Sequence, residues 1–255
     1  VVLFMGYPSD ILSSRAVVKP GLFAVIPENG LVNNVIPVLK GCRTSILASP
    51  KMGAGFVEYV IEVEPSGGTV SPMASEKGVE CFLYCISGNI TANGVRLESG
   101  GFVYSPPDSG MTFENCGTEK AKIIFYKQKY IPFGDKKPYQ VTGNINETKY
   151  RIYDDMENVF IKDFLTTDDL SFDMNMHILA FAPGGCHPFV ETHVQEHGAY
   201  ILTGEGMYLM EDKWMPIKKN DFMWFGAFVQ QGAYGVGREM FSYIYSKDCN
   251  RDVVL

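Results

Sequence analysis

The sequence has few of the features that mark membrane, secreted or nucleic-acid-binding proteins. In its 255 residues, no apolar run approaches the roughly 20 residues that a helix needs to span a bilayer. Lys and Arg number 22 against 29 Asp and Glu, and the net charge of −7 argues against nucleic acid or an anionic membrane as a partner. Residues 1–7 lack the length and the basic start of a signal peptide. Met5 is a candidate natural start, which leaves open whether residues 1–4 are native.

Paired cysteines are also missing. The six cysteines include no C-x-x-C motif, and Cys81 and Cys85 are spaced as neighbours on one face of a strand. Two residues on one strand are not easily joined by a disulfide. The simplest interpretation is a set of reduced thiols, which predicts a cytoplasmic protein.

Few stretches show a sustained helical period. From residue 44 onward, short apolar runs alternate with turn signals: residues 56–63 precede Pro65-Ser66-Gly67-Gly68, and Asn93-Gly94 is a strong hairpin signal. The pattern predicts an all-β fold of sandwich or barrel type. A hydrophobic content of 46% is enough for one large domain or two smaller ones.

The second half of the chain repeats the scheme of the first. Ile86-Ser87-Gly88 matches Leu202-Thr203-Gly204, and Pro107 matches Gly226 at nearly the same offset. A tandem duplication of one β-barrel follows. We expect lead-in strands in residues 1–40, a first barrel in 41–131, a linker rich in Pro, Gly, Lys and Asp within 132–150, and a second barrel in 151–255.

Histidine is scarce and concentrated. Three of the four histidines, His187, His193 and His197, fall within residues 184–204. Glu191, His193 and His197 stand at i, i+2 and i+6, and on a β-strand these positions project from the same face. One carboxylate and two imidazoles pointing into one cavity would suit a divalent metal. The alternative is a strand whose polar residues face solvent.

These residues are similar to the signature of the cupin superfamily, a family of small β-barrels. Five residues match the first cupin block, with the carboxylate moved to its front: Gly185, Glu191, His193, His197 and Gly204. Three match the second: Asn220, Gly226 and Gln231. With residues 172–177, 191–200 and 242–252, the chain closely resembles the (S)-ureidoglycine aminohydrolase family. The likeness covers nearly the whole chain and is densest after Phe172.

The resemblance implies a bicupin fold, two tandem jelly-roll barrels. It also implies a hydrolase acting on C–N bonds, which converts (S)-ureidoglycine to (S)-ureidoglycolate and ammonia in allantoin and purine breakdown. One Mn²⁺ per chain would lie in the second barrel, held by Glu191, His193, His197 and Gln231. Two oxygen and two nitrogen ligands leave two positions of an octahedron for substrate or water. For Gln231 a surface amide is the alternative.

The closing strand offers substrate contacts. Tyr243 and Lys247 are four residues apart, hence on one strand face. The resemblance implies that both bind substrate, together with Glu191 and Gln231, and that Lys247 pairs with the substrate carboxylate. Glu191 and Lys247 are therefore the catalytic candidates. His177 is either a further substrate contact or a core histidine with its hydrogen bonds satisfied.

Other polar residues are assigned structural roles. His187, followed by Pro188, is predicted to be structural or exposed. Glu196 has the opposite strand parity to His193, so it should face away from the metal.

The first barrel departs from the cupin pattern. In the same alignment, the four ligand positions are taken by Ser75, Lys77, Cys81 and Thr112. A charged lysine is no ligand, and Ser and Thr are poor ones, so we expect this barrel to bind no metal. Its expected role is to pack against the second barrel and to build the surface of a homo-oligomer.

Two other function classes stay open. One is a different metal-dependent bicupin enzyme, an iron dioxygenase or a sugar isomerase. The other is a non-enzymatic bicupin that binds a small acid, although no DNA-binding module accompanies the barrels.

Overall fold

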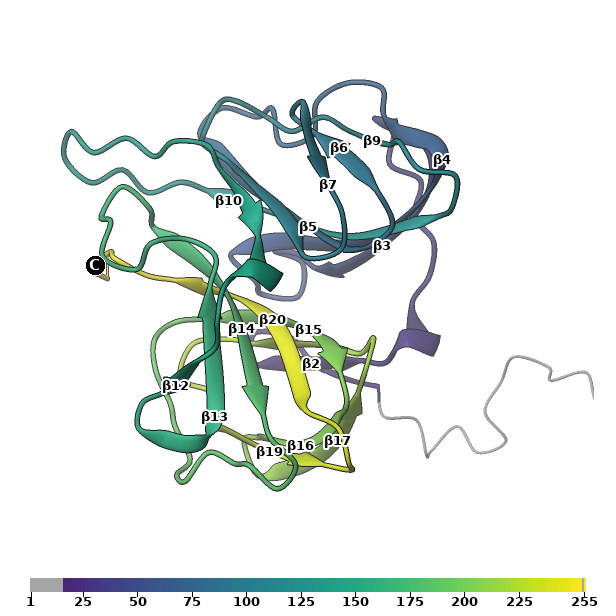
Figure 1. Cartoon of the computed structure of the whole chain (residues 1–255). Helices are drawn as coiled ribbons and strands as arrows, with labels where there is room; N and C mark the ends of the chain where they lie inside the picture. The colour runs from purple at the N-terminus through teal and green to yellow at the C-terminus, as the bar shows by residue number, and fades with distance from the viewer. Residues whose placement is uncertain (1–15, 254) are drawn as a thin grey trace, which may run out of the picture.

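The chain folds into two β-barrels, which form the upper and lower lobes of Figure 1. The computed structural model describes residues 16–253 and 255; the expectations about Met5 and a signal peptide lie outside these residues. In the described part, regular structure is β-strand apart from two 3-10 turns, Glu28–Gly30 and Ile145–Glu147. The predicted all-β class is confirmed. Over the same residues, the structure holds no helix of the length and apolarity that a membrane crossing requires.

The first barrel is a nine-stranded antiparallel sheet in the order β11-β8-β5-β10-β4-β9-β6-β7, with β3 paired to β4. Its strands are β3 (Leu39–Ala48), β4 (Phe56–Thr69), β5 (Val79–Ser87), β6 (Ile90–Ala92), β7 (Val95–Leu97), β8 (Gly101–Ser105), β9 (Phe113–Asn115), β10 (Ala121–Lys129) and β11 (Val141–Asn144). The predicted hairpin at Asn93-Gly94 is confirmed: both residues have positive φ, 45° and 77°, and they join β6 to β7.

The second barrel consists of an eight-stranded sheet and a three-stranded one. The order of the first is β1-β2-β18-β15-β20-β14-β13-β12, and that of the second is β17-β16-β19. The strands are β1 (Val17–Lys19), β2 (Phe23–Ile26), β12 (Arg151–Tyr153), β13 (Met156–Asp163), β14 (Met174–Phe181), β15 (His197–Thr203), β16 (Glu205–Met210), β17 (Lys213–Lys218), β18 (Phe222–Phe225), β19 (Gln231–Val236) and β20 (Phe241–Asp248).

Two segments, β1–β2 and β11, pair with a different barrel from the one that their position in the sequence suggests. Strands β1 and β2 precede the first barrel in the chain, yet β2 pairs with β18 of the second, with Val25 opposite Met223. Strand β11 lies inside the expected 132–150 linker, yet it pairs with β8 of the first barrel. The residues expected to form a lead-in therefore extend the second sheet. The domain boundaries remain a proposal, revised by these pairings.

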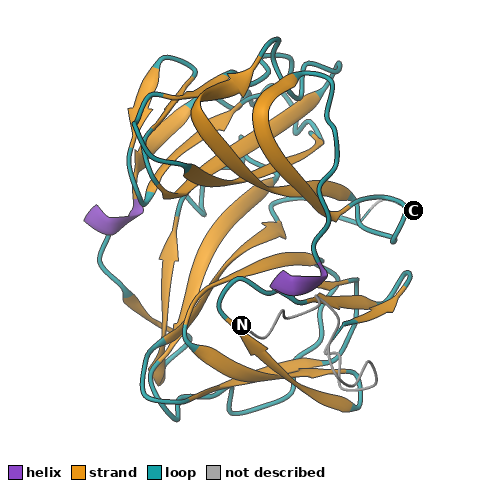
Figure 2. Cartoon of the chain, turned by 90° about the vertical axis from the view of Figure 1, so that its right-hand side faces the viewer, coloured by secondary structure: helices purple, strands orange, loops and turns teal. Residues whose placement is uncertain are grey.

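Strand alternation places side chains in three separate cores. On β4, Tyr59 and Ile61 point into the first barrel, whereas Phe56 and Val60 point toward the second. A second core fills the later barrel around Tyr208. The core that contains Phe56 also takes residues from β14, β15 and β20, so it joins the two lobes that face each other in Figures 1 and 2. The period of two along each strand thus builds both barrels and the interface between them.

Candidate metal centre

The predicted site residues of the second barrel line one cavity. Its lining comprises Tyr153, Leu179, Glu191, His193, His197, Tyr208, Phe225, Gln231, Tyr243, Tyr245 and Lys247. Six of these were named from the sequence: Glu191, His193, His197, Gln231, Tyr243 and Lys247. The cavity lies inside the barrel, on the opposite side of β15 and β20 from the first barrel.

The backbone brings Glu191, His193 and His197 together in a different way from the one predicted. Glu191, His193 and His197 do not share one strand: Glu191 forms an isolated bridge with Gln231, His193 lies outside regular secondary structure, and β15 begins only at His197. The segment instead bonds to the loop before β19. Phe228 donates its N–H to the His193 carbonyl at 2.7 Å. The expected single strand was wrong, but the convergence of the three side chains on one cavity was right.

Backbone carbonyl groups orient both histidine rings. Nδ1 of His193 lies 2.9 Å from the carbonyl oxygen of Gln195, and Nδ1 of His197 lies 2.8 Å from that of Ser246. A carbonyl only accepts, so each Nδ1 carries a hydrogen. Burial lowers the pKa of His193, and burial together with the neighbouring His193 lowers the pKa of His197 well below its ordinary value. Both rings are therefore neutral at pH 7, with lone pairs on Nε2.

The Nε2 lone pairs of the two imidazoles face each other. The Nε2 atoms of His193 and His197 are 3.2 Å apart, and neither carries a hydrogen to bond the other. Two lone pairs held at this distance by fixed hydrogen bonds on the far side of each ring are what a shared cation requires. The donor set therefore fits a divalent metal.

Gln231 contacts the His193 ring, and it is buried, at 2% exposed. Its Nε2 lies 2.8 Å from Nε2 of His193, and its Oε1 accepts a hydrogen bond from Tyr208 at 3.2 Å. The alternative of a surface amide is therefore wrong. Tyr208 was missed in the sequence, although its parity with buried Met210 on one strand is a signal that could have found it.

Glu191 lines the cavity, but it is not part of the contact between the imidazoles of His193 and His197. Two backbone hydrogen bonds of 2.9 Å hold it opposite Gln231. Burial raises the pKa of its carboxyl group, and the charge of Lys247 opposes that rise. Across residues 16–253 and 255, no three His, Cys, Asp or Glu side chains form a metal-binding group by themselves. A metal here would depend on the amide of Gln231 as well as on the carboxylate.

The closing strand β20 supplies one wall. Tyr243, Tyr245 and Lys247 all line the cavity, as their shared parity predicts. Burial raises the pKa of the Tyr243 and Tyr245 hydroxyls well above the ordinary value, so both stay protonated and can donate hydrogen bonds. Tyr153, from the β12–β13 hairpin, was not anticipated because nothing local in the sequence links that hairpin to the cavity.

The remaining histidines lie outside the cavity lining. Nδ1 of His177 is 2.7 Å from a carboxylate oxygen of Asp163, and its ring stacks on Tyr245. These contacts favour the core-histidine interpretation. His187 is half-buried and accepts a hydrogen bond from the backbone N–H of Ala233, in agreement with a structural role, and burial lowers its pKa to about 4.

Glu196 faces away from the site, as predicted, although it precedes β15 and strand parity is therefore not the cause. Its two carboxylate oxygens accept hydrogen bonds from the N–H of Gly55 in the first barrel and from the indole of Trp224. It therefore ties the two barrels together.

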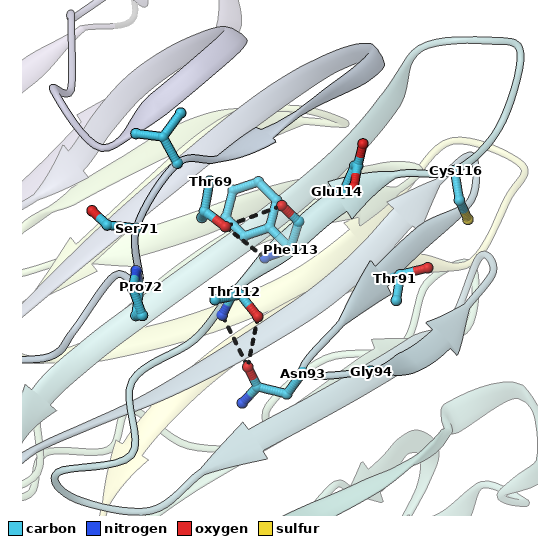
Figure 3. A pocket seen from close by; sticks show the side chains of 11 residues that line it. Thr69, Ser71, Pro72, Thr91, Asn93, Gly94, Thr112, Phe113, Glu114 and Cys116 are labelled. Atoms are coloured by element: carbon cyan, nitrogen blue, oxygen red, sulfur yellow. Dashed lines mark hydrogen bonds between the residues drawn. The ribbon is translucent and has the colours of Figure 1, made fainter.

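The first barrel carries methionines where the second has its oxygen ligands. Met73 and Met111 form the isolated bridge that corresponds to Glu191 and Gln231, and both are buried with Cys81 in the apolar core. The bridge favours Met73 and Met111 over the predicted Ser75 and Thr112 as the counterparts of Glu191 and Gln231. Ser75 and Lys77 are exposed. Thr112 lies in a surface groove, where Oδ1 of Asn93 accepts hydrogen bonds from its N–H and its hydroxyl, as Figure 3 shows.

Comparison with known proteins agrees with this description. No family model matches the chain. The crystal structure of protein Ylba from E. coli superposes with a TM-score of 0.87, at 47% identity over 98% of this chain and 100% of that one. A Bacillus subtilis oxalate decarboxylase, only 10% identical, has a TM-score of 0.64 over 93% of this chain and 79% of that one, a likeness of fold alone. The two tandem barrels define a bicupin.

The sequence narrows the assignment. The chain is 50% identical over 253 residues to the (S)-ureidoglycine aminohydrolase of Escherichia coli (strain K12), which covers 97% of this chain and 96% of that protein. The chain belongs to the (S)-ureidoglycine aminohydrolase family and is an enzyme of the hydrolase class.

Proposed function

We propose that the chain catalyses the Mn²⁺-dependent hydrolysis of (S)-ureidoglycine to (S)-ureidoglycolate and ammonia, a step of allantoin and purine breakdown. The observation that carries the proposal is the 50% identity to a named (S)-ureidoglycine aminohydrolase over nearly the full length. The paired Nε2 atoms in the second barrel support the metal.

The proposed metal shell is His193 and His197 through Nε2, Glu191 through its carboxylate and Gln231 through its amide oxygen. For this the Gln231 amide must turn over, because in the structure its nitrogen faces His193 and its oxygen faces Tyr208. Imidazole nitrogen with several oxygens suits Mn²⁺, although the same donors also bind Zn²⁺. When bound, the cation would hold substrate and polarise a water molecule. Tyr208 can hold the Gln231 amide in either orientation, because its hydroxyl both donates and accepts hydrogen bonds.

The other side chains of the cavity account for substrate binding. Lys247 would pair its ammonium with the substrate carboxylate. The protonated hydroxyls of Tyr243 and Tyr245 can donate hydrogen bonds to the ureido oxygen. Hydrolysis replaces a C–N bond by a C–O bond, and the attacking water must lose a proton. Glu191, whose pKa is raised by burial, is the carboxylate of the cavity: its oxygen that does not bind the metal would accept this proton and return it to the departing amine, which leaves as ammonia.

The proposal includes one Mn²⁺ per chain and a homo-oligomeric enzyme in the cytoplasm. Among the described residues, strand β7 lies at one end of its sheet, and this supports self-association, because an open strand edge is a site for contact with another chain.

Chelation tests the proposed reaction directly. Protein treated with EDTA and desalted is expected to release no ammonia from freshly prepared (S)-ureidoglycine, and added Mn²⁺ is expected to restore release. Ammonia is measured in a coupled assay while an oxygen electrode records the same reaction. Full activity after verified removal of metal would contradict the Mn²⁺ requirement. Oxygen uptake during turnover would instead favour a dioxygenase.

Replacing Lys247 with methionine is expected to weaken substrate binding and to leave the metal in place. Methionine keeps most of the length but removes the charge that pairs with a carboxylate. A hydrogen bond to a charged group contributes about 1.5–3 kcal/mol, so kcat/KM should fall roughly 10–100-fold. Lys213→Met, on the exposed end of β17, is the matched control. An unchanged kcat/KM in Lys247→Met would show that Lys247 does not bind the substrate.

A further inference from the structure

Strand β7 of the first barrel, in the upper lobe of Figure 1, has an open edge. It is the last strand at its end of the sheet, and among the described residues no other strand pairs with its outer side. A groove of about 480 Å³ runs along this edge, with Arg96 and Glu98 on one side and Thr142 and Gly143 of β11 on the other. Strand β7 contains no proline and no lysine, the residues that often prevent pairing at an edge. The edge is therefore accessible to a strand of another chain.

The β6–β7 hairpin determines which backbone groups face outward from this edge. Ala92 and Val95 flank the two-residue turn, so they form a hydrogen-bonded pair between β6 and β7. Because the direction of the backbone groups alternates along a strand, the N–H and C=O of Arg96 point away from β6, and those of Glu98 point the same way. The Glu98 carbonyl accepts the N–H of Gly101 at 2.8 Å, but its oxygen has a second lone pair.

The two charged side chains at this edge lie on the same face. Arg96 and Glu98 are exposed, whereas Val95 and Leu97 pack into the core of the first barrel. The ion pairs within the described residues join other side chains. Residues two positions apart on a strand are separated by roughly 7 Å, which is too far for a close contact without bending of both side chains. Both charges are therefore available to a partner.

A second copy of this chain matches the edge in one register. In an antiparallel pair about a two-fold axis, the residues whose backbone groups face the partner lie opposite each other. With Arg96 and Glu98 as these residues, the registers place Arg96 opposite Arg96, Glu98 opposite Glu98, or Arg96 opposite Glu98. The first two bring like charges together, which is destabilising, whereas the third brings opposite charges together twice. Its two-fold axis passes beside Leu97.

We propose that two copies of this chain associate through β7, antiparallel about a two-fold axis at Leu97, with Arg96 of each copy opposite Glu98 of the other. In each pair, the N–H of Arg96 donates to the Glu98 carbonyl, and the N–H of Glu98 donates to the Arg96 carbonyl. The two β6–β7 hairpins then form one continuous antiparallel sheet. The inference rests on the proposed homo-oligomer and names its surface. It is independent of the proposed reaction, because no residue of β7 lines the cavity of the second barrel.

Charge reversal at the edge tests the register. Arg96→Glu places two carboxylates opposite each other in both pairs, so the dissociation constant of the dimer, measured by sedimentation equilibrium, is expected to rise about tenfold or more. Glu98→Arg is expected to have the same effect through opposed guanidinium groups. The double variant Arg96→Glu/Glu98→Arg restores opposite charges and should return the dissociation constant toward the wild-type value. Arg238→Glu is the matched control: Arg238 is exposed in the β19–β20 turn of the second barrel, and its variant should dissociate as the wild type does.

Hydrogen exchange gives a second measurement on the same proteins. The amides of Arg96 and Glu98 should exchange more slowly in the wild type as its concentration rises through the dissociation constant, and independently of concentration in Arg96→Glu. A wild type that stays monomeric at every concentration would contradict both the homo-oligomer and this surface. An oligomer with equal dissociation constants in the wild type and Arg96→Glu would overturn the β7 interface alone. Ammonia release, measured on the same samples, reports the proposed reaction separately.

Discussion

Replacing His197 with alanine is expected to abolish Mn²⁺ binding and ammonia release together. The imidazole, at the start of β15, supplies one of the two facing Nε2 lone pairs. The loss should exceed the roughly 10–100-fold change typical of outer-shell residues, because a ligand itself is removed. Metal per chain is measured by atomic absorption after desalting, and turnover by ammonia release.

The control for this variant is His187→Ala. His187 lies outside the cavity lining and contacts the backbone of Ala233, so metal content and turnover should be retained. Glu191→Ala tests the carboxylate in the same way and should lose both properties. Retained metal with full activity in His197→Ala would contradict the whole assignment of the site.

The second large effect is expected from Glu58, a carboxyl buried between the barrels. Glu58 is 0% exposed, and among the described residues neither of its carboxyl oxygens has a hydrogen-bond partner. Burial raises its pKa from 4.5 to about 8. In the folded protein it is therefore protonated at pH 7, whereas in the unfolded chain it is ionised. Its contribution to stability is fully present below pH 4.5 and is lost as the pH rises to about 8.

The size of this effect follows from the shift. Between the two pKa values, the contribution falls by about 1.4 kcal/mol per pH unit, or about 4 kcal/mol from pH 5 to pH 8. Glu58→Gln cannot ionise, so its stability relative to the wild type should rise by that amount over the same range. The free energy of unfolding is measured in urea at each pH.

An exposed carboxylate of the same barrel is the control. The free energy of unfolding of Glu114→Gln should change with pH in the same way as that of the wild type, because Glu114 is exposed to solvent. If the free energy of unfolding of Glu58→Gln also changed with pH as that of the wild type does, the Glu58 carboxyl would be ionised in the folded protein. A cation or water molecule beside it would then have to stabilise the charge.

Features that depend on neighbours along the chain were predictable. The Asn93-Gly94 hairpin was expected because its residues readily adopt positive φ. Tyr243 and Lys247 were expected to share a face because alternation along a strand needs no partner. Both features belong to one strand or one turn, so the sequence pattern is sufficient.

Features that depend on distant segments were not predictable in the same way. The alignment placed Ser75 and Thr112 at the ligand positions of the first barrel, whereas the pairing of strands puts Met73 and Met111 there. The spacing of motifs along the sequence does not reveal an alignment error of one or two residues, but such an error exchanges exposed residues for buried ones.

The sequence by itself determined the all-β class, the duplication and the set of candidate ligands in the second barrel, because strand period, turn residues and a histidine-rich block are local properties. Only the tertiary structure decided that β2 joins the second barrel, that Glu191 and His193 reach the cavity from a loop, and that Glu196 meets Gly55 of the first barrel. These contacts join residues far apart in the chain. They form because burying apolar strand faces brings the segments together, and no local spacing records which segments will meet.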